Sequence, residues 1–219
     1  MKRFDIIAEA DARVLEPGST VELARGGHIT PLARDTLRER RITVIEEGSA
    51  SAEDLSLVPR ADIKSLAIGS DHTGVALKRT LVAFLRGRGL AVEDLGAEGP
   101  EPVDYPDVAA RVAHGVARHE ADAGIVIDAA GIGSAIAANK VPGIRAAMAG
   151  SETMARYGRE HNGANVLTLG ATLVSAGEAN AIVSAWLSAT MRDPHDIRRL
   201  AKIRDLERSG RPPGQHDPR

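Results

Sequence analysis

Along most of the chain, hydrophobic residues occur in two patterns: in short unbroken runs, and at a spacing of four positions. Short unbroken apolar runs, such as Leu66–Ile68 and Ile125–Ile127, are typical of strands buried on both faces of a sheet. Other apolar residues recur every fourth position, as Val108, Val112 and Val116 do, which predicts amphipathic helices. The alternation of strand and helix predicts a doubly wound parallel α/β sheet that binds ligands at the carboxyl ends of its strands.

The predicted sheet has five strands with helices on both faces. The apolar segments expected to supply the strands are 66–68, 91–95, 125–127, 144–148 and 166–169. The helices are expected at 77–85, 108–116 and 134–139, from about 151, and at 179–187 and 194–208. A loop with three prolines is expected at 96–106.

The first 48 residues have a different pattern. Thr30 followed by Pro31 is a good helix start, because threonine caps a helix and proline is favoured at its first position. A strand is expected at Ile42–Ile45, and Val14–Leu23 is expected to be extended chain around a turn. These residues predict a small docking or oligomerisation module, or merely an ordered arm, since they are too few for a deep core.

Small and polar residues follow, and we interpret residues 49–64 as a linker. The chain then divides into an N-terminal extension (1–48), this linker, one α/β domain (65–208) and a disordered tail (209–219). On this division, residues 1–60 are expected to be dispensable for the fold of the α/β domain.

Composition narrows the classes of function. The net charge of −2 and the pI near 6.4 give no electrostatic reason to expect nucleic acid or a membrane surface as a partner. Because cysteine is absent, disulfides, thiolate catalysis and cysteine-bound metals are excluded, and a cytoplasmic location is expected. No apolar run approaches the length of a membrane span, and the first residues do not lead into the apolar core of a signal peptide.

The segment Gly124–Met148 carries the strongest chemical signal. Asp128 ends its buried strand, the small residues of Ala129–Gly133 let the backbone come close to a ligand, and a helix begins at Ser134. A helix N-terminus favours negative charge, so a carboxylate facing amide donors here could move a proton while holding an oxyanion. The same pattern also fits an ordinary strand-to-helix turn.

The sequence does not contain a complete motif for a nucleotide cofactor or a metal site. The loop Gly69–Gly74 has the glycine spacing of a nucleoside-triphosphate loop, but the lysine and hydroxyl residue that such a loop requires do not follow it. Gly131 and Gly133 lack the third glycine of a dinucleotide site, since Ile136 stands there. The histidines form no paired ligand motif, so neither a cofactor nor a metal is expected.

Four motifs follow one another along the chain: IGSDHTGVALK (68–78), DYPD (104–107), ANKVPGIRAA (138–147) and REHNGANVL (159–167). Together they resemble the ribose-5-phosphate isomerase B family, which also includes the galactose-6-phosphate isomerase subunits. The similarity covers about Leu66 to Glu207. It implies a Rossmann-like homodimer that has its active sites at the subunit interface, needs no metal and interconverts aldose and ketose phosphates through an enediolate.

The resemblance implies roles at the sugar end of a substrate. Asp71 matches an acidic residue that binds sugar hydroxyls, and Gly131 and Gly133 match a loop that donates backbone amides. His161 matches the histidine that opens the sugar ring, and Asn162 matches its neighbour that holds the enediolate.

At the phosphate end, His72 matches a phosphate-side histidine, and Arg199 matches one of two phosphate-binding arginines. Two arginines usual in the family are replaced here, one by His195 and one by Thr172. His195 is retained as a predicted substrate-binding residue, because its imidazole can carry a positive charge near neutral pH.

The catalytic base is the main departure from the family pattern. Family members carry a cysteine base at the position of Asp128, or a glutamate base at the position of Ser134, and a hydroxyl residue at that of Ala130. A carboxylate is an adequate base for a carbon acid beside a carbonyl. We therefore predict that Asp128 is the base and count Ser134 among the substrate-binding residues.

The N-terminal segment HITPLARDTLRERRITVI (28–45) resembles short segments of enzymes associated with bacterial microcompartments. This resemblance implies a targeting or assembly module, a shell or cargo protein as its partner, and a place inside such a compartment.

Three hypotheses of function follow. The leading one is a homodimeric isomerase that converts ribose 5-phosphate to ribulose 5-phosphate, with Asp128 as the base and His161 opening the ring. A related hypothesis is another enolisation of a sugar phosphate, such as an epimerisation. The third is a binding or scaffold protein that kept the pocket without the catalytic activity.

Overall fold

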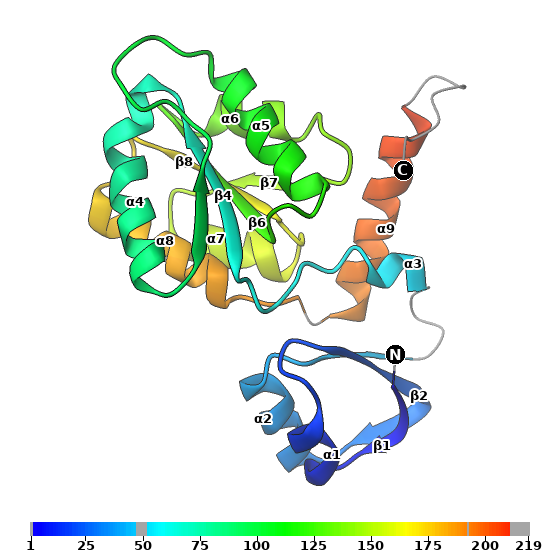
Figure 1. Cartoon of the computed structure of the whole chain (residues 1–219). Coiled ribbons are helices and arrows are strands. Elements are labelled where there is room, and N and C mark those ends of the chain that lie inside the picture. Colours follow the sequence, from blue (N-terminus) through cyan, green and yellow to red (C-terminus); the bar gives the residue numbers. More distant parts are fainter. Residues whose placement is uncertain (1, 47–51, 192, 211–219) are drawn as a thin grey trace.

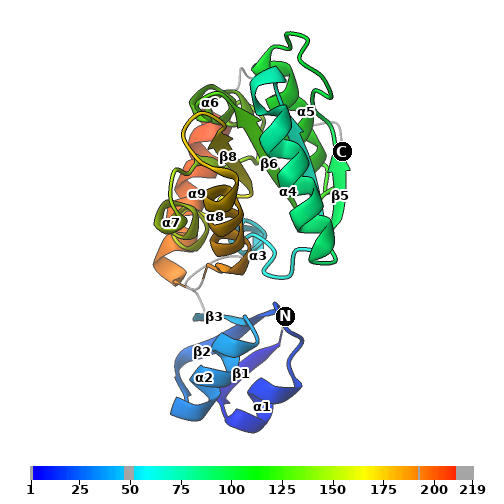
Figure 2. The same ribbon diagram turned by 90° about the vertical axis from the view of Figure 1, so that its left-hand side faces the viewer.

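The computed structural model describes residues 2–46, 52–191 and 193–210, which form two sheets of parallel strands. The smaller sheet has the strand order β1-β2-β3, and the larger has the order β5-β4-β6-β8-β7. Figures 1 and 2 show the smaller sheet and its helices as a unit of their own beside the larger one.

The larger unit confirms the predicted five-stranded parallel sheet. Its strands are β4 (Ser65–Ser70), β5 (Ala91–Asp94), β6 (Ala123–Asp128), β7 (Ala146–Met148) and β8 (Val166–Gly170). The helices around it are η1 (His72–Gly74), α4 (Val75–Gly87), α5 (Tyr105–Ala117), α6 (Ile132–Ala138), α7 (Glu152–Glu160) and α8 (Ala176–Ser188).

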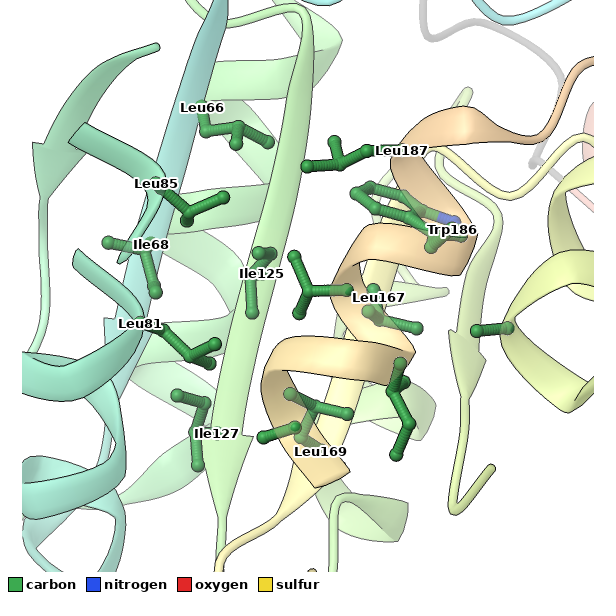
Figure 3. Close-up of a cluster of buried hydrophobic side chains, with 14 of the residues drawn as sticks. Leu66, Ile68, Leu81, Leu85, Ile125, Ile127, Leu167, Leu169, Trp186 and Leu187 are labelled. Carbon is green, nitrogen blue, oxygen red and sulfur yellow. The ribbon is translucent and has the colours of Figure 1, made fainter. Parts of the chain in front are cut away.

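Helices cover both faces of this sheet, as its apolar runs require. On one face α4 and α8 pack against the strands, and Figure 3 shows Leu81, Ile125 and Trp186 in the apolar cluster on this face. On the other face the valines of α5 pack on Ala67 and Val126, beside α6. Because both faces of β4, β6 and β8 are buried, these strands alternate little between apolar and polar residues, which is why short apolar runs predicted them.

The smaller unit consists of β1 (Arg3–Ile7), α1 (Glu9–Val14), β2 (Thr20–Ile29), α2 (Pro31–Glu39) and β3 (Thr43–Glu46). The start of α2 is as predicted, with the Thr30 hydroxyl accepting from the amide of Ala33 at 3.3 Å. The stretch Val14–Leu23, predicted to be extended around a turn, has a turn at Pro17-Gly18 and the start of β2 at Thr20, and only Val14 belongs to α1. The unit also has a core of its own: Ile7, Ala12, Leu15, Val21, Leu23, Ala33, Leu37 and Ile42.

The segment predicted as a linker makes ordered contacts with the larger unit. A short helix, α3 (Ala52–Leu55), lies beside the last helix, α9 (Pro194–Ser209). The side chains that pack together at this junction come from β3, the linker segment, α9 and the residue Met191 shortly before α9: Ile45, Leu55, Leu57, Val58, Met191, Ile197 and Leu200. Of the tail predicted at 209–219, Ser209 is the last residue of α9 and Gly210 caps it, and residues 211–219 lie outside the described residues.

The buried Arg159 and the half-buried Arg145 hold the same segment by its backbone. Arg145 donates from Nη2 to the carbonyl of Leu57 at 2.8 Å, and Arg159 donates from Nη2 to the carbonyl of Arg60 at 2.7 Å. The Arg159 guanidinium also lies 5.0 Å from the centre of the Trp186 ring. Burial lowers the pKa of Arg145 to about 10 and, together with the charge of Arg145, that of Arg159 to about 9.

Candidate active site

Asp128 ends β6 and is almost completely buried, with 5% of its surface exposed. One carboxylate oxygen accepts from the amides of Ala130, at 2.8 Å, and Gly131. The other accepts from the amide of Ser134 at 2.9 Å and from its hydroxyl at 2.5 Å. A carboxylate has about four lone-pair sites, so these four donors occupy all of them.

These contacts set the charge of Asp128. Burial by itself would raise the pKa of the carboxyl, but the hydrogen bonds from Ser134, Gly131 and Ala130 outweigh it and hold the pKa below its usual range. Asp128 is therefore ionised at neutral pH. A carboxylate of low pKa is a weaker base than an ordinary one, so these hydrogen bonds make Asp128 less basic than a free aspartate.

The loop after β6 is fixed from several sides. Gly131 has a φ of 75°, and a Cβ added there would lie 2.8 Å from the carbonyl carbon of Leu169, so only glycine fits. The Thr168 hydroxyl donates to the Gly131 carbonyl at 2.7 Å, and the Thr172 hydroxyl donates to the Ala129 carbonyl at 2.6 Å. Thr172 thus supports the loop at the position where the family pattern has an arginine.

Two predicted substrate contacts in this loop do not fit the structure. The Gly131 amide was expected to face a ligand, but it points inward to the Asp128 carboxylate. Ser134 was expected to bind substrate, but it is fully buried and its hydroxyl also serves Asp128. The amide of Gly133 forms no hydrogen bond within the described part of the chain, and the Tyr105 ring lies directly against this glycine.

Asp71 and His72 follow β4, the strand next to β6. The amide of Asp71 donates to the carbonyl of Ile127 at 3.1 Å, so Asp71 lies at the same carboxyl edge of the sheet as Asp128. The Asp71 carboxylate accepts from Thr73 Oγ1 at 2.6 Å. His72 is exposed, and its Nδ1 accepts from the amide of Val103 at 3.4 Å.

The other predicted residues lie at the amino edge of the sheet, where its parallel strands begin. His161 and Asn162 come just before β8, which runs parallel to β6 with Val166 opposite Gly124 and Gly170 opposite Asp128. His161 Nδ1 lies 3.0 Å from Asp196 Oδ2 on α9, and Arg199 Nη1 lies 2.5 Å from Asp196 Oδ1. His195 is exposed on the first turn of α9.

The predicted site residues therefore form two groups that one chain does not bring together. We call those at the carboxyl edge of the sheet the strand-end group: Asp71, His72, Asp128, Gly131, Gly133 and Ser134. We call those beside α9 the α9 group: His161, Asn162, His195 and Arg199. The length of β8, at about 3.3 Å per residue, alone separates the two edges by about 13 Å.

Sequence reasoning missed Asp196, Tyr105 and the role of Thr172. A carboxylate three residues before Arg199 is a signal for an ion pair on a helix. The contact of Asp196 with His161, which lies 35 residues earlier in the chain, cannot be predicted from any pattern in the sequence. The described residues contain no cluster of three or more His, Asp or Glu side chains that could hold a metal ion. None of the helices that the structure describes combines the length and the apolar character needed to cross a membrane.

Comparisons with known proteins agree with the family resemblance of the four sequence motifs at 68–78, 104–107, 138–147 and 159–167. The profile of the Ribose/Galactose Isomerase family matches residues 66–203. Ribose-5-phosphate isomerase B of Escherichia coli is 41% identical over 145 residues, which are 66% of this chain and 97% of that protein.

Solved structures agree as well. Ribose-5-phosphate isomerase B of Clostridium thermocellum is 48% identical with a TM-score of 0.66, over 66% of this chain and 98% of that one. The enzyme of the same name from Mycoplasma genitalium, solved with bound ribulose 5-phosphate, is 38% identical with a TM-score of 0.64, over 66% and 96%. The chain therefore belongs to the ribose/galactose isomerase family of sugar-phosphate isomerases.

Proposed function

We propose that this protein converts ribose 5-phosphate to ribulose 5-phosphate through an enediolate. The observation that carries the proposal is the pair of buried carboxylates, Asp128 and Asp71, on adjacent strand ends at the carboxyl edge of the sheet. Ligands of open α/β sheets bind at this edge. The relatives named above supply the identity of the sugar phosphate.

In the proposed reaction, Asp128 removes the proton on C2 of the open-chain aldose. The electrons of the C2–H bond form the C1–C2 double bond of the enediolate, and the Gly133 amide stabilises the oxyanion. The proton of the O2 hydroxyl moves to O1, Asp128 returns its own proton to C1, and O2 becomes the carbonyl oxygen of the ketose. His161 opens the ring beforehand, Asn162 holds the enediolate, and Arg199, His72 and His195 bind the phosphate.

This chemistry requires a homodimer, because one chain holds the strand-end group and the α9 group at opposite edges of its sheet. A second copy would bring its α9 group to the strand-end group of the first. Large apolar side chains are exposed near both groups, as a contact between copies would need. They are Ile132 and Ile136 on α6, 55% and 59% exposed, and Met154 and Tyr157 on α7, both 49% exposed.

Mixing two inactive variants tests both the activity and the composite site. Asp128→Asn and His161→Ala should each lose most turnover of ribose 5-phosphate. In a mixed dimer, one site carries both substitutions and the other carries neither, so equal mixing of chains should restore about a quarter of the parent activity. A mixture no more active than the two variants assayed apart would show that each site is built from one chain.

A specific observation favours a second function, that of a sugar-phosphate-binding protein without turnover. All acceptor sites of Asp128 are filled, and only 5% of its surface is exposed, so the carboxylate could serve only to shape the loop. Calorimetry with ribulose 5-phosphate, beside a turnover assay of the parent, distinguishes the two functions. Tight binding without turnover would support the second.

Ser134→Ala should weaken the fold in a pH-dependent way. The variant loses a hydrogen bond to a buried charge, which costs about 1.5–3 kcal/mol at pH 7. The folded pKa of Asp128 is depressed, so its stabilisation is present above the unfolded pKa and is lost as the pH falls through the folded pKa. Urea unfolding should therefore show a smaller difference between variant and parent near pH 3 than at pH 7. A difference that is the same at both pH values would contradict this account of Asp128.

Two further expectations stay predictions. One is that His195 binds phosphate in place of an arginine. The other is that the N-terminal extension is a targeting or assembly module of a microcompartment.

A further inference from the structure

A buried carboxylate on α9 faces the imidazole of His161. The Asp196 side chain is 2% exposed, whereas that of His161 is 53% exposed, and Asp196 Oδ2 lies 3.0 Å from His161 Nδ1. The Tyr157 ring meets the same imidazole edge to face, with the ring centres 5.3 Å apart and the planes at 63°. The imidazole is therefore held from α9 and from α7.

This arrangement determines which nitrogen of His161 is free to react. A carboxylate accepts but does not donate, so it favours the tautomer whose proton is on Nδ1. Nε2 is then left with its lone pair, on a side chain that is half exposed. Carboxylates hydrogen-bonded to histidine in this way orient the ring and stabilise the imidazolium that forms when Nε2 takes up a proton.

The same carboxylate also contacts Arg199, the residue predicted to bind the phosphate of the substrate. Asp196 Oδ1 accepts from Arg199 Nη1 at 2.5 Å, so the two oxygens of one buried side chain are divided between His161 and Arg199. The positive charge of Arg199 compensates the buried negative charge, which would otherwise be costly. Asp193, one turn earlier, has a different role, since it caps α9 by accepting from the amide of His195 at 2.8 Å.

We propose that Asp196 is a positioning residue for ring opening, which holds His161 with Nε2 free and Arg199 beside it. The proposal rests on the proposed function. In the step itself, His161 Nε2 takes the proton from the anomeric hydroxyl of the furanose, the C1–O4 bond breaks and the C1 carbonyl forms. The imidazolium then returns that proton to O4, so the step needs no other reactant.

Two substrates separate ring opening from every other step. Ribose 5-phosphate is a furanose and must be opened, whereas ribulose 5-phosphate is acyclic, because the oxygen that could close its ring is esterified. Asp196→Asn keeps the shape of the side chain but removes its charge. We expect kcat to fall about 10–100-fold with ribose 5-phosphate, the usual loss when the partner of a functional histidine is removed.

With ribulose 5-phosphate, the same variant should lose less than about threefold in kcat, because that substrate bypasses the ring-opening histidine. Any weakening of phosphate binding through Arg199 would raise KM for both substrates and leave the ratio of their two kcat values unchanged. Asp193→Asn is the matched control, since asparagine caps a helix as well as aspartate does and touches neither His161 nor Arg199. The control should leave the ratio of the two rates unchanged.

A spectroscopic measurement tests the proposal without turnover. The ¹⁵N shifts of His161 at about pH 8, where an ordinary imidazole is neutral, should show the Nδ1–H tautomer in the parent and a mixture of tautomers in Asp196→Asn. Equal losses with both substrates, or an Nε2–H tautomer in the parent, would overturn the proposal. If the parent turned over neither substrate, the proposed function would fail, and the tautomer would still decide the role of Asp196.

Discussion

Asp128→Asn is expected to reduce turnover of ribose 5-phosphate by roughly 10²–10⁴-fold, the usual loss when a general base is removed. It should also weaken the fold. Asparagine keeps one acceptor oxygen but presents an NH₂ group where the carboxylate accepts from the amide of Ser134, so two donors would face each other. An unsatisfied buried group costs about 1–3 kcal/mol, which urea unfolding at pH 7 would measure.

Ser134→Ala is the control that separates the two effects, since it loosens the same loop and keeps the carboxylate. If Asp128 is the base, Asp128→Asn should lose far more turnover than Ser134→Ala at a similar loss of stability, while calorimetry still detects bound ribulose 5-phosphate. If the losses of turnover simply follow the losses of stability, Asp128 acts by shaping the loop. An unchanged kcat in Asp128→Asn would remove this residue from the mechanism.

Removal of residues 1–60 is expected to destabilise the larger unit severely. The deletion takes away the carbonyls of Leu57 and Arg60, which are acceptors for the half-buried Arg145 and the buried Arg159. Hydrogen bonds to charged groups contribute about 1.5–3 kcal/mol each, so the loss of both is large beside a typical total stability of about 5–15 kcal/mol. It also uncovers apolar side chains of α9. This expectation replaces the one from the division of the sequence, that residues 1–60 are dispensable.

A second deletion provides the matched comparison. A chain that begins at Ala52 lacks the smaller unit but keeps α3 and both carbonyl acceptors. Its urea midpoint should lie well above that of the chain that begins at Ala61, and closer to that of the full chain. Equal midpoints for the two truncated chains would show that the arginine contacts contribute little.

The sequence predicted the larger unit well because its inner strands β4, β6 and β8 are buried on both faces, so that each of these is largely a short apolar run. The smaller unit was harder to predict. In β1 only Ile7 is fully buried, so this strand has no clear alternation. In the segment 52–60, Leu55, Leu57 and Val58 pack at the junction, but the segment is also anchored by its backbone carbonyls, which composition does not reveal.

The candidate site shows a similar limit. The carboxylate, the small residues and the helix start at 128–134 predicted a loop in which backbone amides meet a negative charge, and the structure has such a loop. The charge that the amides of Ala130 and Gly131 meet is that of Asp128 itself, and this depends on which way each amide points. By contrast, the separation of Asp128 from His161 follows from the parallel direction of β6 and β8, because Asp128 ends one strand and His161 precedes the other.

The junction between the two units joins distant parts of the chain, and this affects how the protein is made. The Thr43 hydroxyl donates to the carbonyl of Met191, 148 positions later, and Ile45 is buried against α9. During synthesis the N-terminal residues leave the ribosome first, so the smaller unit can form its sheet long before α9 exists. Ile45 then stays uncovered until almost the whole chain has been translated. Docking of α9 is therefore expected to be among the last events of folding, and nascent chains that stop short of it would present an apolar surface to chaperones.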